Sequence, residues 1–155
     1  MAFTLTSTAF EHGQPVPAQY TCEGGDMSPP LAWREPPAGT RSFALIADDP
    51  DAPMGTWVHW VVWNIPATEQ GLAEHIPKQE RLANGTRQGM TDFHRVGYGG
   101  PCPPSGTHRY FFTLYALDAQ LTLSPKATKA QLLAALHGHV LAQSELMGAY
   151  QRSRQ

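Results

Sequence analysis

The residues Ser42-Phe43-Ala44-Leu45-Ile46-Ala47-Asp48-Asp49-Pro50-Asp51-Ala52-Pro53 carry the strongest structural signal in the chain. The first half is apolar at odd and even positions, and successive strand residues point to opposite faces, so both faces must be covered. The second half cannot continue a buried strand, because proline lacks an N–H and unpaired carboxylates are costly to bury. We therefore expect a central strand that ends in a restricted, polar turn carrying Asp49 and Asp51.

Size and charge narrow the class of protein. The chain has 155 residues, which fits a single domain over residues 1–155 that needs neither a metal nor a disulfide to fold. Its 11 Lys and Arg and 13 Asp and Glu are interspersed, which argues against nucleic-acid binding. Fourteen glycines and 14 prolines favour short strands and turns over a helical bundle.

Two further long strands are expected, at residues 56–65 and 108–117. In the first, strict alternation places one set of side chains on a common face: Trp57, His59, Val61, Trp63 and Ile65. In the second, His108, Tyr110, Phe112 and Leu114 share a face. Both strands begin with polar and aromatic side chains.

The remaining segments are shorter or less regular. We expect strands at residues 3–10 and 31–33, an edge segment at 14–21 and a terminal strand at 144–150. Residues 66–94 show no sustained periodicity and predict a surface excursion with one short edge strand. Residues 128–141 predict an amphipathic helix capped by Thr128. Strands first and a helix late predict a mainly β, antiparallel sandwich with one or two short helices, the main one near the C-terminus.

The N-terminus and the two cysteines give expectations about the cellular compartment of the protein. The N-terminus lacks a signal-peptide pattern, and no segment has the length and hydropathy of a membrane span, so a cytoplasmic protein is expected. Cys22 and Cys102 lack the CxxC spacing of metal or redox sites. We expect them to be small, partly buried free thiols rather than a disulfide; a signal peptide on a longer precursor would favour the disulfide instead.

Polar residues gather where three of the expected strands end or begin. In an antiparallel sheet the end of one strand lies beside the start of its neighbour, so Asp49 and Asp51 can meet His59, His108 and Tyr110. Two imidazoles, a phenol and the backbone N–H groups of a glycine-rich loop suit a phosphoryl or carboxylate group. The acids would orient the histidines and raise their pKa, making them cationic donors. The alternative is that His59 is a satisfied core histidine and the two acids are turn residues.

Other charged and titratable residues are expected to be structural. Arg109 points away from His108 and predicts an ion pair with a carboxylate, for which Asp48 is a candidate. His137 and His139 lie two residues apart on a predicted helix, so they cannot share a metal-binding face.

Four motifs, taken together, resemble one protein family. They are Ser28-Pro29-Pro30-Leu31 with Trp33, Asp49-Pro50-Asp51-Ala52-Pro53, Trp57-Val58-His59-Trp60, and the run from Gly100 to Tyr110 that reads GPCPPSGTHRY. They resemble the phosphatidylethanolamine-binding protein family, and within it the bacterial Raf kinase inhibitor-like branch. The chain departs from eukaryotic members at Cys102, where glycine is usual, and at Val58, where a histidine is common.

The resemblance implies a β-sandwich with an anion pocket at one end for phosphate-bearing groups such as phosphorylethanolamine. Carried over residue by residue, it implies these pocket residues: Asp49, Asp51, Trp57, His59, His108 and Tyr110, with Pro103 and Pro104 in the adjoining loop. No cofactor is implied. The ligand would be a phosphate-bearing small molecule or a lipid head group.

Three functions compete at this point. The first is a non-enzymatic anion-binding protein whose occupancy modulates a kinase or protease partner. The second is a phosphoester hydrolase, metal-dependent or acid–base, that uses the same His and Asp pocket; the chain lacks the HExxH and serine-elbow motifs that would favour it. The third is a structural or oligomerisation domain, and a homodimer is compatible with apolar strands in a sandwich.

Overall fold

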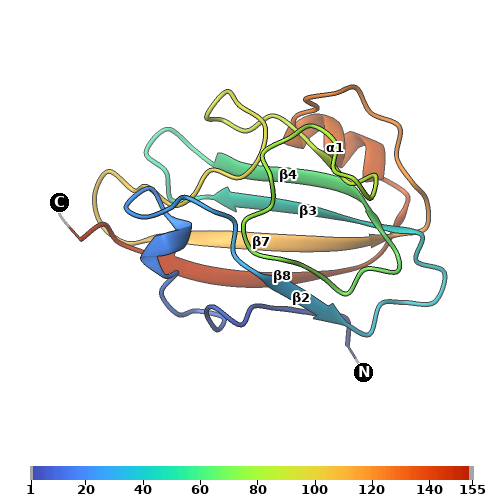
Figure 1. Ribbon diagram of the computed structural model, residues 1–155, viewed down its shortest axis with the longest axis horizontal. Coiled ribbons are helices and arrows are strands. Elements are labelled where there is room, and N and C mark those ends of the chain that lie inside the picture. Colours follow the sequence, from blue (N-terminus) through green and yellow to red (C-terminus); the bar gives the residue numbers. More distant parts are fainter. Residues whose placement is uncertain (1, 154–155) are drawn as a thin grey trace.

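The computed structural model describes residues 2–153 as two antiparallel β-sheets and one α-helix (Figure 1). The five-stranded sheet has the order β6-β4-β3-β7-β8, and the three-stranded sheet the order β1-β2-β5. The expected mainly β, antiparallel sandwich is confirmed. The strands are β1 (Thr4–Thr6), β2 (Leu31–Arg34), β3 (Ser42–Asp49), β4 (Trp57–Pro66), β5 (Gly71–Leu72), β6 (Arg87–Gln88), β7 (His108–Leu117) and β8 (Val140–Tyr150); the helix is α1 (Lys129–Leu136), and η1 (Ala18–Tyr20) is a 3₁₀ turn.

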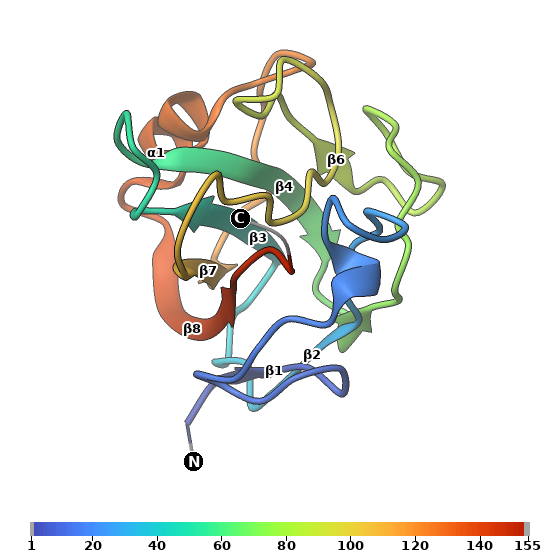
Figure 2. The same ribbon diagram turned by 90° about the vertical axis from the view of Figure 1, so that its left-hand side faces the viewer.

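The central strand β3 has both faces buried, as its sequence predicts. Phe43 and Leu45 pack in the core between the two sheets, whereas Ala44 and Ile46 pack in a second core beneath α1. Figure 2 shows α1 on the opposite side of β3 and β4 from β1 and β2. Burying each large apolar side chain stabilises the fold by about 1.5–3 kcal/mol, so the two cores together fix β3 at the centre of the molecule.

Strand β4 departs from the strict alternation that the sequence suggests. Ala47 pairs with Trp60 and Asp48 with Val58, which leaves His59 as the extra residue of a β-bulge. Trp60 therefore packs between the sheets, while Val58 and Val61 pack toward α1. The expectation that Trp57, His59, Val61, Trp63 and Ile65 share one face is wrong, because a bulge shifts the alternation by one residue.

Near the end of β4 the alternation shifts again. Phe43 pairs with Ile65 and Leu45 with Val62, which leaves an extra residue in β4 between those two pairs. Asn64 lies there with a positive φ of 55°. As a result Trp63 belongs to the core beneath α1 and Ile65 to the core between the sheets.

Several shorter elements differ from their predictions. The strand expected at residues 3–10 is only three residues long, as β1. The edge segment expected at 14–21 makes a single bridge from Pro15 to Ala149 and then turns into η1. The excursion at 66–94 has two short strands, and Gln88 is buried: its side chain accepts from Trp60 Nε1 at 2.8 Å and donates to two backbone carbonyls.

The helix begins as predicted and ends early. Thr128 is the N-cap, and its side chain and that of Gln131 form a capping box. The helix ends at Leu136, and Gly138, with φ of 85°, lets the chain turn directly into β8. The expected helix over 128–141 is thus too long, and the expected terminal strand too short. In the described part of the chain, no helix combines the length and apolar character that crossing a bilayer requires.

Candidate functional site

A cavity of about 340 Å³ opens at the end of the sandwich where β3 ends and β4 and β7 begin. This end lies at the left in Figure 1 and faces the viewer in Figure 2. The strand connections bring three distant parts of the sequence together there. The lining residues are Asp49, Ala52, Pro53, Met54, Trp57, His59, Phe93, Cys102, Pro103, Pro104, His108 and Tyr110. Every residue predicted for the site lies in this set except Asp51.

Asp49 and His108 form a buried pair at the cavity. The Nδ1 atom of His108 lies 2.7 Å from Oδ2 of Asp49, and their exposed fractions are 7% and 3%. Because an ionised carboxylate only accepts, His108 donates through Nδ1–H, which fixes the ring and leaves Nε2 for a ligand. Asp49 thus orients a histidine, as expected for one of the acids.

His59 has a different partner. Its Nδ1 lies 2.6 Å from the carbonyl oxygen of Gly99, so Nδ1–H donates and Nε2 carries the lone pair of the neutral ring. Burial lowers the pKa of His59, outweighing the backbone hydrogen bond and the nearby Asp49 that would raise it. His59 is therefore neutral at pH 7, contrary to the expectation that both histidines have a raised pKa.

The Tyr110 hydroxyl bonds both to Asp49 and to the backbone of Cys102. Burial raises the pKa of this hydroxyl far above the usual value, and the charge of Asp49 and a side-chain hydrogen bond to it act in the same direction. A backbone hydrogen bond from Cys102 opposes the shift. The phenol therefore stays protonated at physiological pH and contributes a hydroxyl group to the site.

Asp51 lies outside the cavity and pairs with Arg109. Arg109 Nε and Nη2 contact the two carboxylate oxygens at 2.9 and 2.8 Å, and its backbone N–H adds a third bond of 2.9 Å. These side-chain hydrogen bonds are the main reason that the pKa of Asp51 falls to about 2. The predicted pairing of Arg109 with Asp48 is wrong, because Asp48 faces α1 and binds Lys129 Nζ at 2.6 Å.

Apolar side chains complete the walls, and four of them were not predicted as site residues: Ala52, Pro53, Met54 and Phe93. Phe93 packs edge-on against Trp57 and His59, with ring centroids 5.6 and 5.2 Å apart. It comes from the aperiodic segment 66–94, where a lone aromatic residue in a polar loop is the only signal. Met54 lies at the mouth with 95% of its surface exposed.

The loop that carries Pro103 and Pro104 is fastened by a disulfide. Cys22 and Cys102 are bonded, with Cα atoms 5.4 Å apart. The prediction of free thiols is wrong because the loops around the two cysteines lie side by side: Cys22 N–H also donates to the Pro101 carbonyl at 3.1 Å. That proximity depends on the tertiary fold, not on sequence spacing.

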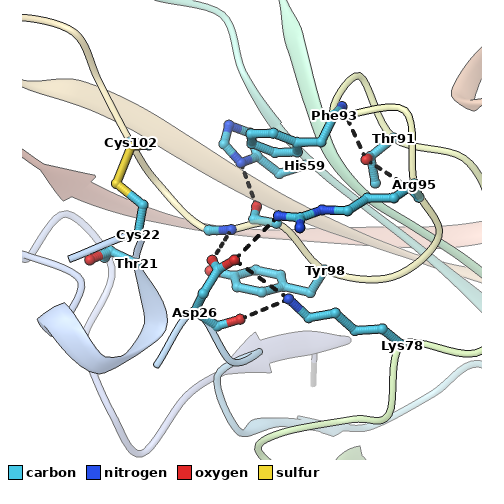
Figure 3. Close-up of polar contacts among 12 residues, drawn as sticks. Thr21, Cys22, Asp26, His59, Lys78, Thr91, Phe93, Arg95, Tyr98 and Cys102 are labelled. Carbon is cyan, nitrogen blue, oxygen red and sulfur yellow. Dashed lines mark hydrogen bonds and ion pairs between the residues drawn. A yellow bond between two sulfur atoms is a disulfide. The ribbon is translucent and has the colours of Figure 1, made fainter. Parts of the chain in front are cut away.

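Asp26 fastens the same loop a few residues earlier (Figure 3). Its Oδ1 accepts from the Gly100 N–H at 2.7 Å, and Lys78 and Arg95 approach Oδ2 at 3.5 Å. A Cβ on Gly100 would lie 2.3 Å from a backbone oxygen, so this close approach requires glycine. Since the Gly99 carbonyl holds His59, Asp26 indirectly positions that histidine.

The described donor groups around the cavity do not form a metal site. Within residues 2–153, no three His, Cys, Asp or Glu side chains are grouped so that they could hold a metal ion. Asp49 and His108 form a pair with each other, and His59 donates to a carbonyl.

Comparison with protein-family models identifies the fold family. The model described as "Phosphatidylethanolamine-binding protein" matches residues 6–151. The chain belongs to this family.

Relatives and solved structures agree with the family assignment. A "UPF0098 protein" from Methanothermobacter thermautotrophicus is 51% identical over 148 residues, covering 96% of this chain and 98% of the relative. One from Aquifex aeolicus is 48% identical, covering 94% and 86%. The crystal structure of the PEBP homologue CT736 from Chlamydia trachomatis has a TM-score of 0.91 and 41% identity, covering 98% of this chain and 99% of its own. Escherichia coli YbcL, a member of the mammalian PEBP family, also has a TM-score of 0.91, with 34% identity and coverage of 99% and 100%.

Proposed function

We propose that this protein is a non-enzymatic receptor for a small anion, namely a phosphoryl group such as that of phosphorylethanolamine. The observation that carries the proposal is the convergence of two imidazoles on one cavity, each with Nδ1 already bonded to the protein. Both rings are therefore fixed, and both Nε2 atoms are available to a ligand. The Tyr110 hydroxyl lines the same cavity.

The walls around these polar groups are apolar, which favours binding of a charged ligand. Prolines, Trp57 and Phe93 form apolar walls. Water is poorly competitive in such a site, so each hydrogen bond to an anion is stronger than it would be on an open surface. Asp49 lies behind His108 and holds its Nδ1, leaving Nε2 to meet the anion.

The same Asp–His pair could serve a hydrolase as a general base. Nucleophilic catalysis also needs a nucleophile within reach of the base. The described lining residues include no serine, threonine or lysine, and Cys102 is in a disulfide. These features favour binding over covalent catalysis in the proposal.

The test is isothermal titration calorimetry with inorganic phosphate and phosphorylethanolamine, comparing wild type with His108→Ala. A hydrogen bond to a charged group contributes about 1.5–3 kcal/mol, so the variant should bind about 10- to 100-fold more weakly. The matched control is His139→Ala, because His139 Nδ1 also bonds an aspartate, Asp118, at 2.8 Å but lies on the surface.

Three results would contradict the proposal. Absence of saturable binding by wild type would remove the receptor function, and equal loss in His139→Ala would remove its assignment to this cavity. Hydrolysis of phosphorylethanolamine by wild type, lost in His108→Ala, would replace the receptor by the hydrolase.

The proposal extends to a protein partner, a kinase or a protease, whose activity responds to pocket occupancy. The family resemblance suggests the class, and the exposed Met54 at the cavity mouth offers an apolar contact. On this view Met54→Gln would weaken binding of the partner more than it weakens binding of phosphate. The whole chain would act as one domain, as a monomer or a homodimer.

A further inference from the structure

A second cavity, of about 270 Å³, lies at the other end of β4. It is lined mainly by polar side chains, namely Asn64, Arg81, Asn84, Arg87 and Gln120, together with Pro66 and Gly85. Asn64 is seven residues along β4 from Trp57, which corresponds to about 23 Å at the rise of a strand. The two cavities are therefore separate sites.

Two arginines are placed side by side at this cavity. Arg81 and Arg87 are direct partners in an antiparallel bridge, closed by a turn in which Leu82 N–H donates to Thr86 O at 2.8 Å. Direct partners project from the same face with Cβ atoms about 4.5–5.5 Å apart, and like charges in this arrangement destabilise the pair. The backbone thus places the two arginines next to each other, an arrangement that is costly for like charges.

Nothing in the described chain offsets that cost. Among residues 2–153, neither guanidinium has an ion-pair partner, and Arg87 Nε is buried without a hydrogen bond. A buried donor left unsatisfied is itself destabilising. Glu69 reaches the rim, where it accepts from Asn84 Nδ2 at 3.4 Å, and does not pair with either arginine.

The amide groups around the arginines make the cavity rigid. Asn64 donates to the Leu121 carbonyl and accepts from the Leu121 N–H, both at 2.8 Å, which fixes the chain next to the lining residue Gln120. Asn84 Oδ1 accepts from Thr86 N–H at 3.0 Å and fixes the turn. Two buried polar atoms of the described residues near this cavity have no hydrogen bond, Arg87 Nε and the Thr86 hydroxyl.

We propose that this cavity binds a tetrahedral oxyanion, a phosphoryl or sulfate group, between Arg81 and Arg87. Guanidinium groups match such oxygens in bidentate geometry, and a dianion held by their terminal N–H groups would neutralise the paired charges. This site does not depend on the function proposed for the first cavity.

The test uses the full chain carrying His108→Ala, so that the first cavity is impaired. Inorganic phosphate, sulfate and glycerol 3-phosphate are titrated separately while the Nε–H resonance of Arg87 is followed by ¹⁵N NMR. We expect a saturable shift, weakened at least tenfold by Arg81→Gln. A shift with glycerol 3-phosphate alone would show that the site binds a phosphomonoester. A shift with all three ligands would show that it binds the free oxyanion. Arg34→Gln, which removes the same charge from the three-stranded sheet, should have no effect.

Thermal unfolding gives an independent readout. Phosphate should raise the Tm of the His108→Ala protein, and Arg81→Gln should abolish that rise while leaving the Tm in phosphate-free buffer equal or higher, because it removes the repulsion. A linear, non-saturating shift of Arg87, or an equal response in Arg34→Gln and Arg81→Gln, would overturn the proposal.

Discussion

The two histidines of the first cavity hold their protons differently. His108 donates to a carboxylate, whereas His59 donates to a carbonyl and is buried, which lowers its pKa. Its folded pKa therefore lies below the unfolded value of about 6.5, so the stability it contributes is present above that pH and is lost as the pH falls. At pH 7, Nε2 of His59 accepts hydrogen bonds; it can donate to an anion only after protonation.

Anion binding should accordingly take up a proton. We expect sulfate, which does not itself titrate in this range, to bind more tightly as the pH falls from 7.5 to 5.5, by at most about tenfold per pH unit for one linked proton. Calorimetry in buffers of different ionisation enthalpy measures the uptake. His59→Gln should remove the part of the pH dependence that belongs to His59. An affinity independent of pH, with no uptake in wild type, would mean that the anion does not contact His59.

The sequence predicts which titratable residues lie at this site better than it predicts the residues that contact them. Asp49, His108 and Tyr110 follow from strand ends and period-two alternation, both of which survive in β3 and β7. The position of Asp51 could not be predicted in this way, because the alternation stops at Pro50. Its side chain turns to Arg109. Phe93 could not be predicted, since an aperiodic loop gives no geometric rule for where its side chains point.

At the scale of elements, the bulge in β4 decides what the strand presents to the site. It separates the roles of adjacent residues: His59 lines the cavity, while Trp60 packs against Tyr98 and bonds Gln88. A bulge is defined by the register of the partner strand, which a single sequence does not contain. The strand could be predicted from the sequence, but the change in which side chains lie on each face could not.

The loop opposite that bulge depends on Asp26, which gives a prediction for one hydrogen bond. Asp26→Ala removes the acceptor for Gly100 N–H and should cost about 1.5–3 kcal/mol of stability, with weaker phosphate binding because the carbonyl that orients His59 is loosened. Asp26 has a φ of 53°, which asparagine tolerates. Asp26→Asn keeps the acceptor and should stay close to wild type in urea unfolding and calorimetry.

The two variants separate two explanations. If Asp26→Asn lost as much affinity as Asp26→Ala, the ion pairs with Lys78 and Arg95 would be responsible instead. Those contacts are long and partly exposed, so we expect them to contribute little.

At the scale of the whole molecule, the disulfide joins parts of the chain that the sheets alone do not connect. Cys22 and Cys102 are 80 residues apart, and neither lies in a strand. Their pairing follows from the packing of two irregular loops, which explains why composition and spacing favoured free thiols. Disulfides persist mainly in oxidising compartments and in the intracellular proteins of hyperthermophiles.

The last prediction concerns what this bond does for the cavity. Closing a loop of this length stabilises a fold by about 4.5 kcal/mol in the chain-entropy account, so Cys22→Ser with Cys102→Ser should lower the free energy of unfolding by about that amount, measured in urea. Because Cys102 lines the cavity and contacts Tyr110, phosphate affinity should fall as well. Dithiothreitol should reproduce both effects in wild type and leave the double variant unchanged. Lower stability with unchanged affinity would mean that Asp26 and the Cys22 N–H bond to Pro101 suffice to hold the rim, and that the disulfide acts on folding alone.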